Sequence, residues 1–594
     1  MFHHFISLFT FLSLSLILGG CGRPKPTTQG PSKAIQEAKV EVEKGELDPS
    51  ASPNAQRGGS LKTWAGAFPK SLNMWLDYNS FSVKITSLMF ESLVELHSTR
   101  NEPVGNLAKS WTQSKDGLTF TFKIHPKATW SDGKPITSKD VIFFYETMMD
   151  PKNLTSIFRV DLRKIEKPEA IDDKTVKVVA KNQHWKNFWI AAGLYALPKH
   201  AMEGKDFNKL NFKFPVVSGP YALKDVDKGR SISLKRRGDW WGRALAYNQH
   251  KFNFDILSFQ SSADRSKVLE QLKRGDIDVY PIYTAKIWEK QTNFEAVEKN
   301  WVRRQRVFND LPKGFQGVAF NLRRPPFNDP KVREAFALLL DRQLMNEKYM
   351  YNQYFMLNSF YPDLYPGAEN PAVPERVFDE KKARSLLAEA GYTVDAKGRQ
   401  SKGGQALEVT IMVTSPDTRH LSLYKETLAQ VGITLHLQQV DWSTVRKRID
   451  QHQFDLNWSA WGASRLRDPE TMWHSSTANE KSNSNICGVI DPTIDALIES
   501  QRTEMNLDQR NEILKKIDQR LVKINPYALL WGSPAARILY WDRFGMPEKV
   551  FPRFGDPDDM VAYWWFDSKK DSELEKAKGS GQKLLPLPPE VHWK

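Results

Sequence analysis

Apolar and polar positions alternate along the second half of the chain in a way that predicts strands and helices in turn. Leu407–Val413 and Ile433–Leu437 alternate with a period of two, which is typical of half-buried strands. Between them, His420–Val431 has helical spacing and ends before Gly432. A helix between two strands forms a β-α-β unit with parallel strands and a right-handed crossover. The pattern therefore predicts an α/β lobe over roughly residues 313–539.

The first half of the chain shows the same alternation, with longer connections. Thr119–Ile124 alternates as a strand, and Val176–Ala180 and Ile232–Lys235 favour two more. Thr137-Ser-Lys-Asp140 has the spacing of a capping box and precedes apolar residues at helical intervals. A chain of 594 residues is too long for one core, so we expect at least two lobes.

The chain begins with a short apolar run that ends at a cysteine. The run Phe5–Leu18 is too short to cross a bilayer comfortably, and Gly-Gly-Cys21 follows it. The Leu18–Cys21 string resembles a bacterial lipobox, although no Lys or Arg precedes the run. This interpretation makes residues 1–20 a signal peptide and Cys21 the lipidation site. The other interpretation is an ordinary secretory signal with an incidental Cys21. In both, the chain is exported.

The segment after Cys21 predicts a spacer. Residues 22 to about 56 are rich in Pro, Lys, Glu, Ser and Gln and poor in large apolar residues. Such a segment buries too little surface to fold, so residues 21–56 are interpreted as a lipidated cysteine with a flexible tether. A lipidated Cys21 leaves Cys487, the second of two cysteines, without a partner for a disulfide.

The formal charge of +15 is spread along the chain. Its densest basic strings are short and widely separated: Lys235–Arg237, Arg303–Arg306 and Arg446–Arg448. This scatter is typical of solvated faces; alternatively, it indicates a ligand or membrane partner of negative charge. Zinc-finger spacing and RNA-binding aromatic motifs are absent from the sequence, so nucleic acid is not an expected partner.

Motifs of known catalytic and cofactor sites are also absent from the sequence. It contains no His-Glu-x-x-His, no Gly-x-Ser-x-Gly, no phosphate-binding glycine loop and no Cys-x-x-Cys. Its histidines do not cluster at metal-ligand spacing. We therefore expect a protein that is not an enzyme and that needs no metal or cofactor.

The best candidate for a ligand site is the loop that follows the predicted strand Phe454–Trp458. In open α/β sheets, ligands bind beyond the carboxyl ends of the strands, and this loop leaves such an end. Trp458 and Trp461 could cover an organic ligand, while Arg465 and Asp468 could pair with its charged ends. On composition alone, core tryptophans and a charged surface turn explain the loop equally well.

Several strings along the chain match a known family in order. They are Leu107–Trp111, Lys115–Phe122, Trp130–Val141, Ser218–Tyr221, Gly275–Asp278, Phe320–Asn321, Pro326–Arg333 and Ala383–Tyr392. With these strings the chain resembles bacterial extracellular solute-binding proteins of family 5, the oligopeptide- and dipeptide-binding class. Trp130–Val141 resembles the signature segment of the family.

The resemblance implies an α/β fold of the cluster C periplasmic-binding-protein type, with two α/β lobes, a hinge and an extra domain. The first lobe would be discontinuous, over residues 57–85, 210–312 and 540–594. The extra domain would cover 86–209, and the other lobe 313–539.

One position departs from the pattern of many oligopeptide binders. In these proteins an Asp within Trp-x-x-Asp-Tyr pairs with the free amino group of the ligand. Here Trp461-Gly-Ala-Ser464 places Ser464 at that position and Arg465 at the position of the Tyr, with Asp468 four residues further on. The departure resembles the branch with Yej-type oligopeptide and peptide-nucleotide antibiotic uptake proteins. The ligand-binding candidates are therefore Trp458, Trp461, Ser464, Arg465 and Asp468.

The function implied by the resemblance is peptide capture for an ABC transporter. The expected protein is a periplasmic monomer, anchored to a membrane by its lipid, that delivers peptides or peptide-like solutes to a permease. One alternative is a sensory or chemotaxis protein that uses the same fold. Another is a binder of a non-peptide solute, such as a nickel complex.

Overall fold

The computed structural model describes residues 41–414 and 418–593. The predicted signal peptide and Cys21 lie outside the described residues, as do residues 22–40 of the predicted tether. None of the described helices combines the length and apolar character needed to cross a bilayer.

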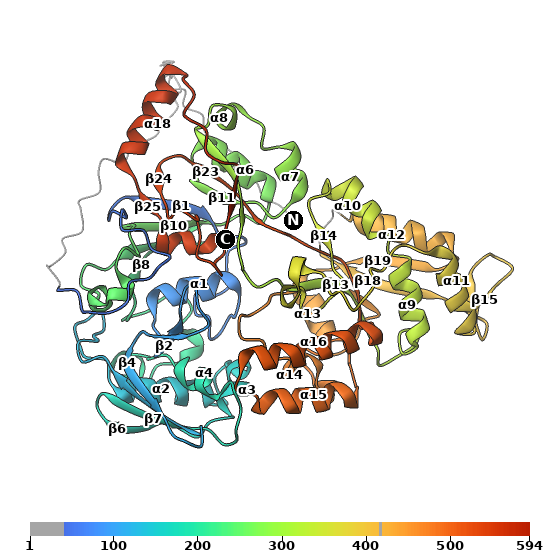
Figure 1. The fold of residues 1–594 in the computed structure, drawn as a ribbon, viewed down its shortest axis with the longest axis horizontal. Helices are drawn as coiled ribbons and strands as arrows, with labels where there is room; N and C mark the ends of the chain where they lie inside the picture. Colours follow the sequence, from blue (N-terminus) through green and yellow to red (C-terminus); the bar gives the residue numbers. More distant parts are fainter. Residues whose placement is uncertain (1–40, 415–417, 594) are drawn as a thin grey trace, which may run out of the picture. The chain divides into compact units, whose positions relative to one another are not determined.

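The largest sheet contains eight strands drawn from distant parts of the chain (Figure 1). Its order is β26 (Glu590–His592), β12 (Val302–Phe308), β23 (Ala536–Trp541), β11 (Val279–Pro281), β1 (Ser60–Trp64), β10 (Ile256–Gln260), β9 (Ser231–Arg236) and β8 (Tyr221–Asp227). β1 runs parallel to both β10 and β11, whereas β23 is antiparallel to β11 and β12. The first and last parts of the chain therefore share one sheet.

A second sheet has five strands, all between residues 315 and 529. Its order is β19 (Thr434–Gln439), β18 (Glu408–Val413), β20 (Leu456–Trp461), β13 (Phe315–Phe320) and β21 (Tyr527–Leu529). β18 and β19 are parallel, with Thr410 opposite His436, and the helix α12 (Arg419–Gln430) connects them. The predicted β-α-β unit is confirmed.

Helices of this part of the chain also begin where the sequence predicts. In α9 (Pro330–Leu338), the side chain of Asp329 accepts a hydrogen bond from the amide of Lys331, and Pro330 occupies the first turn. The other helices of this part include α10 (Arg342–Met350), α11 (Glu380–Glu389), α13 (Trp442–Asp450), α14 (Glu470–Trp473), α15 (Pro492–Thr503) and α16 (Leu507–Ile524).

A third, antiparallel sheet has four strands: β4 (Ala108–Gln113), β5 (Thr119–Ile124), β7 (Thr175–Val179) and β6 (Glu169–Asp172). Helix α2 (Ser138–Met149) lies beside β6 and β7 (Figure 1). The predicted capping box at its start is present, with Asp140 bonded to the Thr137 amide. Helix α1 (Ser80–Met89) and the hairpin of β2 (Val94–Leu96) and β3 (Pro103–Gly105) precede this sheet in the chain. Helix α3 (Ser156–Leu162) follows α2, and α4 (Asn187–Ala192) follows β7.

Two connections cross between the eight-stranded and the five-stranded sheets. Residues 309–314 join β12 to β13. Strand β21 of the five-stranded sheet is followed by the short strand β22 (Trp531–Gly532), and residues 533–535 join β22 to β23. The lobe boundary expected at residue 540 falls inside β23, because this strand pairs with β11 and β12 from Ala536 onward.

The tether prediction is wrong for the residues from Glu43 onward. The carboxylate of Asp48 is fully buried and accepts hydrogen bonds from Ser98 (2.6 Å) and Tyr563 (2.8 Å). Lys251 lies 3.2 Å from it as a buried ion-pair partner. Glu43 contacts His125 at 2.9 Å. Composition indicated a spacer because these residues are polar, but their charges find partners on segments far along the chain.

We predict that Asp48→Ala destabilises the protein by about 3 kcal/mol, because it leaves the Lys251 ammonium buried without a counter-charge. Asp227→Ala is the matched control, since that carboxylate is partly exposed and its ion-pair partner is the neighbouring Arg230. Urea-induced unfolding measures both. Equal losses in the two variants would contradict the packed position of Asp48.

Candidate ligand-binding site

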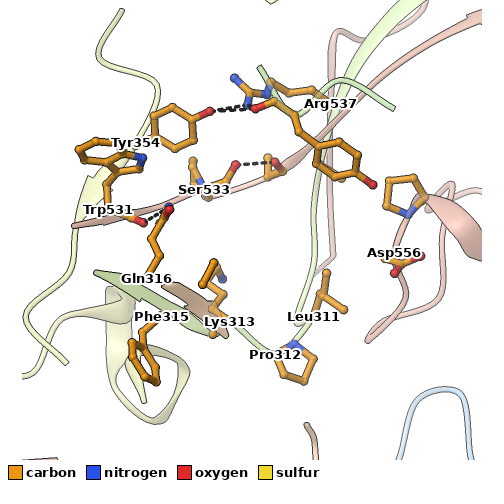
Figure 2. Close-up of a pocket in the computed structure, with 18 of the residues that line it drawn as sticks. Leu311, Pro312, Lys313, Phe315, Gln316, Tyr354, Trp531, Ser533, Arg537 and Asp556 are labelled. Carbon is orange, nitrogen blue, oxygen red and sulfur yellow. Dashed lines mark hydrogen bonds between the residues drawn. The ribbon is translucent and has the colours of Figure 1, made fainter. Parts of the chain in front are cut away.

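A cavity of about 410 Å³ lies where the two connections cross between the sheets (Figure 2). Its lining includes Tyr283 from the side of the eight-stranded sheet and Trp461 and Trp531 from the side of the five-stranded sheet. Most of the wall is formed by residues 311–316 and 531–537. Both sheets and both connections therefore contribute to one cavity.

Two further cavities adjoin the first. One of about 560 Å³ lies at the carboxyl ends of β18 and β20 and shares Ala460 and Trp461 with it. The other, of about 470 Å³, shares Leu311–Lys313 and Pro534 with it. The three cavities follow one another along the first connection and the end of β20.

A glycine allows the first connection to pass close to the end of β20. A Cβ atom added at Gly314 would lie 1.7 Å from the carbonyl oxygen of Trp461. Any other residue would force these two segments apart. Gly314 therefore keeps the connection against the strand that carries the predicted tryptophans.

The two predicted tryptophans line the cavities. The ring of Trp458 lies edge-on to His420 (4.5 Å between centroids) and to Trp531 (5.7 Å). The indole of Trp461 donates a hydrogen bond to the Tyr527 hydroxyl at 3.0 Å. Trp458 lines the second cavity, and Trp461 lines both the first and the second. Both rings are fixed by neighbours and present a preformed aromatic wall.

Ser464 and Arg465 have different surroundings. Ser464 is exposed, and its hydroxyl accepts a hydrogen bond from the Leu466 amide. Arg465 lines the third cavity, but its guanidinium donates to the carbonyl of His97 (2.8 Å) and to the side chain of Asn101 (2.9 Å). Its donors therefore fasten the loop to the turn between β2 and β3.

Asp468 belongs to a charge network that does not line the three cavities. It lies 3.4 Å from Lys186, and together with Glu470 it groups with buried His184. The ligand atoms of these three residues lie within 4.8 Å of one another, as in a metal site. However, Lys164, Lys186 and Arg502 also contact the two carboxylates, at 3.5, 3.4 and 2.7 Å. Three cations already neutralise the group, so it is better described as an ion-pair network.

This network links two distant parts of the chain. Glu470 and Arg502 face His184 and Lys164, and the amide of Trp185 donates to the Arg502 carbonyl at 2.9 Å. The pKa of Glu470 is lowered, first by the hydrogen bond with His184 and then by Lys164 and Arg502, against the opposing effect of burial. The ionised carboxylate therefore stabilises the contact.

The sequence reasoning missed the charged side chains of the first cavity, which are Lys313, Arg537 and Asp556. Arg537 is 6% exposed and donates to the Tyr283 carbonyl and to the Tyr354 hydroxyl, both at 2.8 Å. Burial and the neighbouring Asp558 raise the pKa of Asp556. No local motif marks these residues, because each comes from a different segment.

Comparison with known proteins gives a family and several relatives. The model of the bacterial extracellular solute-binding proteins, family 5 (middle region), matches residues 102–483. A probable peptide-binding protein, YejA of Agrobacterium fabrum, is 25% identical and covers 86% of this chain and 90% of its own length. The peptidoglycan-binding protein YepA of the same organism is also 25% identical, covering 87% of this chain and 92% of its own.

A solved structure shares the fold. The oligopeptide-binding protein AppA from Bacillus subtilis, in complex with a nonapeptide, superposes with a TM-score of 0.72 at 22% identity. The match covers 87% of this chain and 100% of that protein. The predicted α/β fold of the solute-binding type is confirmed.

We predict that Glu470→Gln lowers stability by about 2 kcal/mol at pH 7 through loss of the ion pairs. A lowered folded-state pKa gives a contribution that is present above the ordinary value of 4.5 and is lost as the pH falls. The difference between wild type and variant should therefore shrink below pH ~4.5. Thermal unfolding at several pH values measures it.

Glu512→Gln is the control, because Glu512 is an exposed carboxylate paired with Lys515. A Glu470→Gln effect as small as that of the control at pH 7 would contradict the role of the network.

Proposed function

This chain belongs to the bacterial extracellular solute-binding proteins of family 5, and we propose that it captures peptides or peptide-like solutes for an ABC importer. The observation that carries the proposal is the cavity between the two connections, whose wall comes from both sheets. A relative named as a probable peptide-binding protein and a similar fold in complex with a nonapeptide support the ligand class.

The proposed mechanism is closure about the two connections. The division into two lobes and an extra domain, which the sequence suggested, is part of this proposal. A ligand in the first cavity contacts groups on both sides of the connections and therefore favours the closed arrangement. The half-buried glycines Gly314 and Gly532 line the cavity, and backbone beside them could pair with the backbone of a peptide, which is the same for any sequence. The permease would read the closed form.

The proposed role is binding without chemistry. The ligand is held, carried and released unchanged, which agrees with the family of solute-binding proteins. Recovery of an intact ligand after long incubation supports this role, and a cleaved ligand would contradict it.

A second ligand class deserves the same test because of the second cavity. Trp442 is 66% exposed and lines it, together with His420, Trp458 and Trp461. Aromatic faces suit flat or ring-shaped groups as well as apolar side chains. With a relative named as peptidoglycan-binding, peptidoglycan fragments are a second candidate.

The ligand experiment uses calorimetry with two probes, a pool of synthetic di- to decapeptides and a soluble peptidoglycan digest. We expect Trp461→Ala to weaken binding of the effective probe by about 2 kcal/mol, or roughly 30-fold, through loss of the aromatic wall. Trp111→Ala, on β4 and outside the three cavities, is the control. Its unfolding midpoint and that of Trp461→Ala show whether each variant is folded.

If neither probe binds the wild type, the proposed ligand classes are wrong. If binding is unchanged in folded Trp461→Ala, the location of the site is wrong.

We also propose that Cys21 carries the lipid that holds the protein at the outer side of a bacterial membrane. The proposed tether is then limited to residues 22–42. Intact-mass measurement of protein from membranes should show an acylated residue 21 as the first residue. Cys21→Ser should release the protein from the membrane. A soluble wild-type protein that begins at another residue would contradict the anchor.

A further inference from the structure

Arg537 is a buried cation on the wall of the first cavity. It stands at the start of β23, directly after the second connection. One nitrogen, Nη2, donates to the Tyr283 carbonyl and to the Tyr354 hydroxyl. Figure 2 shows the guanidinium beside Tyr354 and apart from Asp556. The other terminal nitrogen, Nη1, has no hydrogen-bond partner among the described residues.

This guanidinium also has no carboxylate partner within the described chain. Buried charges in proteins are normally paired, because removing a charge from water is costly. The ring of Tyr354 lies 5.3 Å from the guanidinium carbon of Arg537. A ring and two neutral acceptors leave the positive charge largely uncompensated.

The other charges at the cavity do not supply the missing counter-charge. Lys313 is a second cation on the wall and forms no ion pair with a described residue. Asp556 is the one carboxylate among the described lining residues, and its Oδ1 accepts from the Asp558 amide at 2.6 Å. Two of the three charged lining residues, Arg537 and Lys313, are therefore cations without a carboxylate partner among the described residues.

We propose that Arg537 recognises a carboxylate of the ligand, so that the first cavity prefers solutes with a free acid group. The guanidinium fork matches a carboxylate in shape and charge, and the charge-assisted bond is strong where water is excluded. The acid could be the carboxyl terminus of a peptide or an acidic side chain. This inference rests on the proposed function for the class of ligand.

A purely structural role for Arg537 makes a different prediction. Its bonds to Tyr283 and Tyr354 join a segment after β11 to a segment after α10, and this link would stabilise the protein whatever the ligand carries. A purely structural link would not make the protein bind acids more tightly than the corresponding amides, so this preference distinguishes the two roles.

The first experiment needs no variant. Peptides from the pool that bind are resynthesised with a free carboxyl terminus and with a carboxyl-terminal amide, each with and without an acidic side chain. We expect loss of the recognised acid to weaken binding to the wild type by about 10- to 100-fold. Comparison of peptides with and without an acidic side chain shows whether the carboxyl terminus or the side-chain acid is recognised.

The second experiment compares Arg537→Gln and Arg537→Lys with the control Arg304→Gln. Arg304 stacks on Trp288 at 3.8 Å and bonds Thr292, outside the cavity lining. We expect Arg537→Gln to bind acid and amide forms equally and Arg537→Lys to keep part of the preference. Arg304→Gln should keep the preference of the wild type.

The outcomes separate the two proposals. Peptides that bind equally well as acid and amide, with and without acidic side chains, would overturn the role of Arg537 and leave peptide capture intact. If no peptide binds, the proposal of peptide capture is wrong. The inference about Arg537 is then tested by comparing the effects of acetate and acetamide on the unfolding midpoint. Displacement of the unfolding midpoint of the wild type by acetate but not by acetamide, with loss of the acetate effect in Arg537→Gln, supports the inference. Equal effects of the two probes, or an equal effect of acetate on the wild type and on Arg537→Gln, overturn it.

Discussion

The double crossing of the chain between two sheets is the constraint on which the rest of the structure depends. β12 leads through residues 309–314 into β13, and the return through residues 533–535 leads into β23. The side-chain amide of Gln316, just after the first crossing, donates to the carbonyl of Trp531, just before the second, at 2.8 Å. Because each sheet buries its own core, the cavity that both sheets line lies beside these connections. The position of the cavity is therefore a consequence of topology.

The end of β20 and the loop after it have two different tasks, which the sequence suggested were one. The tryptophans of β20 line cavities, whereas Arg465 and Asp468 hold the loop against residues 97–101 and Lys186. Arg465 at the third cavity and Asp468 away from the cavities have protein partners, so these charges hold the loop in place without competing for a ligand. A binding protein gains from this separation, because its closing contacts then do not depend on which solute it carries.

Charge also organises the ends of the chain. Asp48 joins a segment near the start of the described chain to Ser98, Lys251 and Tyr563. Burial alone would raise the pKa of this carboxyl, but Lys251 and the hydrogen bonds outweigh it and lower the pKa. In the first cavity the opposite situation holds, since Arg537 is buried without such a partner among the described residues. This contrast between a compensated and an uncompensated buried charge is the reason that we propose a structural role for Asp48 and a binding role for Arg537.

The sequence by itself determined the local elements and the family. The period of two in Leu407–Val413, the cap at Asp329 and the capping box at Thr137 are local signals, so the structure reproduces them. It also placed Trp458 and Trp461 beside the cavities that we propose for the ligand, because the end of a strand in an α/β sheet is a general binding position. Only the tertiary structure decided the partners of Asp48, Asp468 and Arg537. The partner of a buried charge can lie hundreds of residues away in the sequence, as Lys251 does for Asp48 and Lys186 does for Asp468. No local pattern records whether such a partner is present.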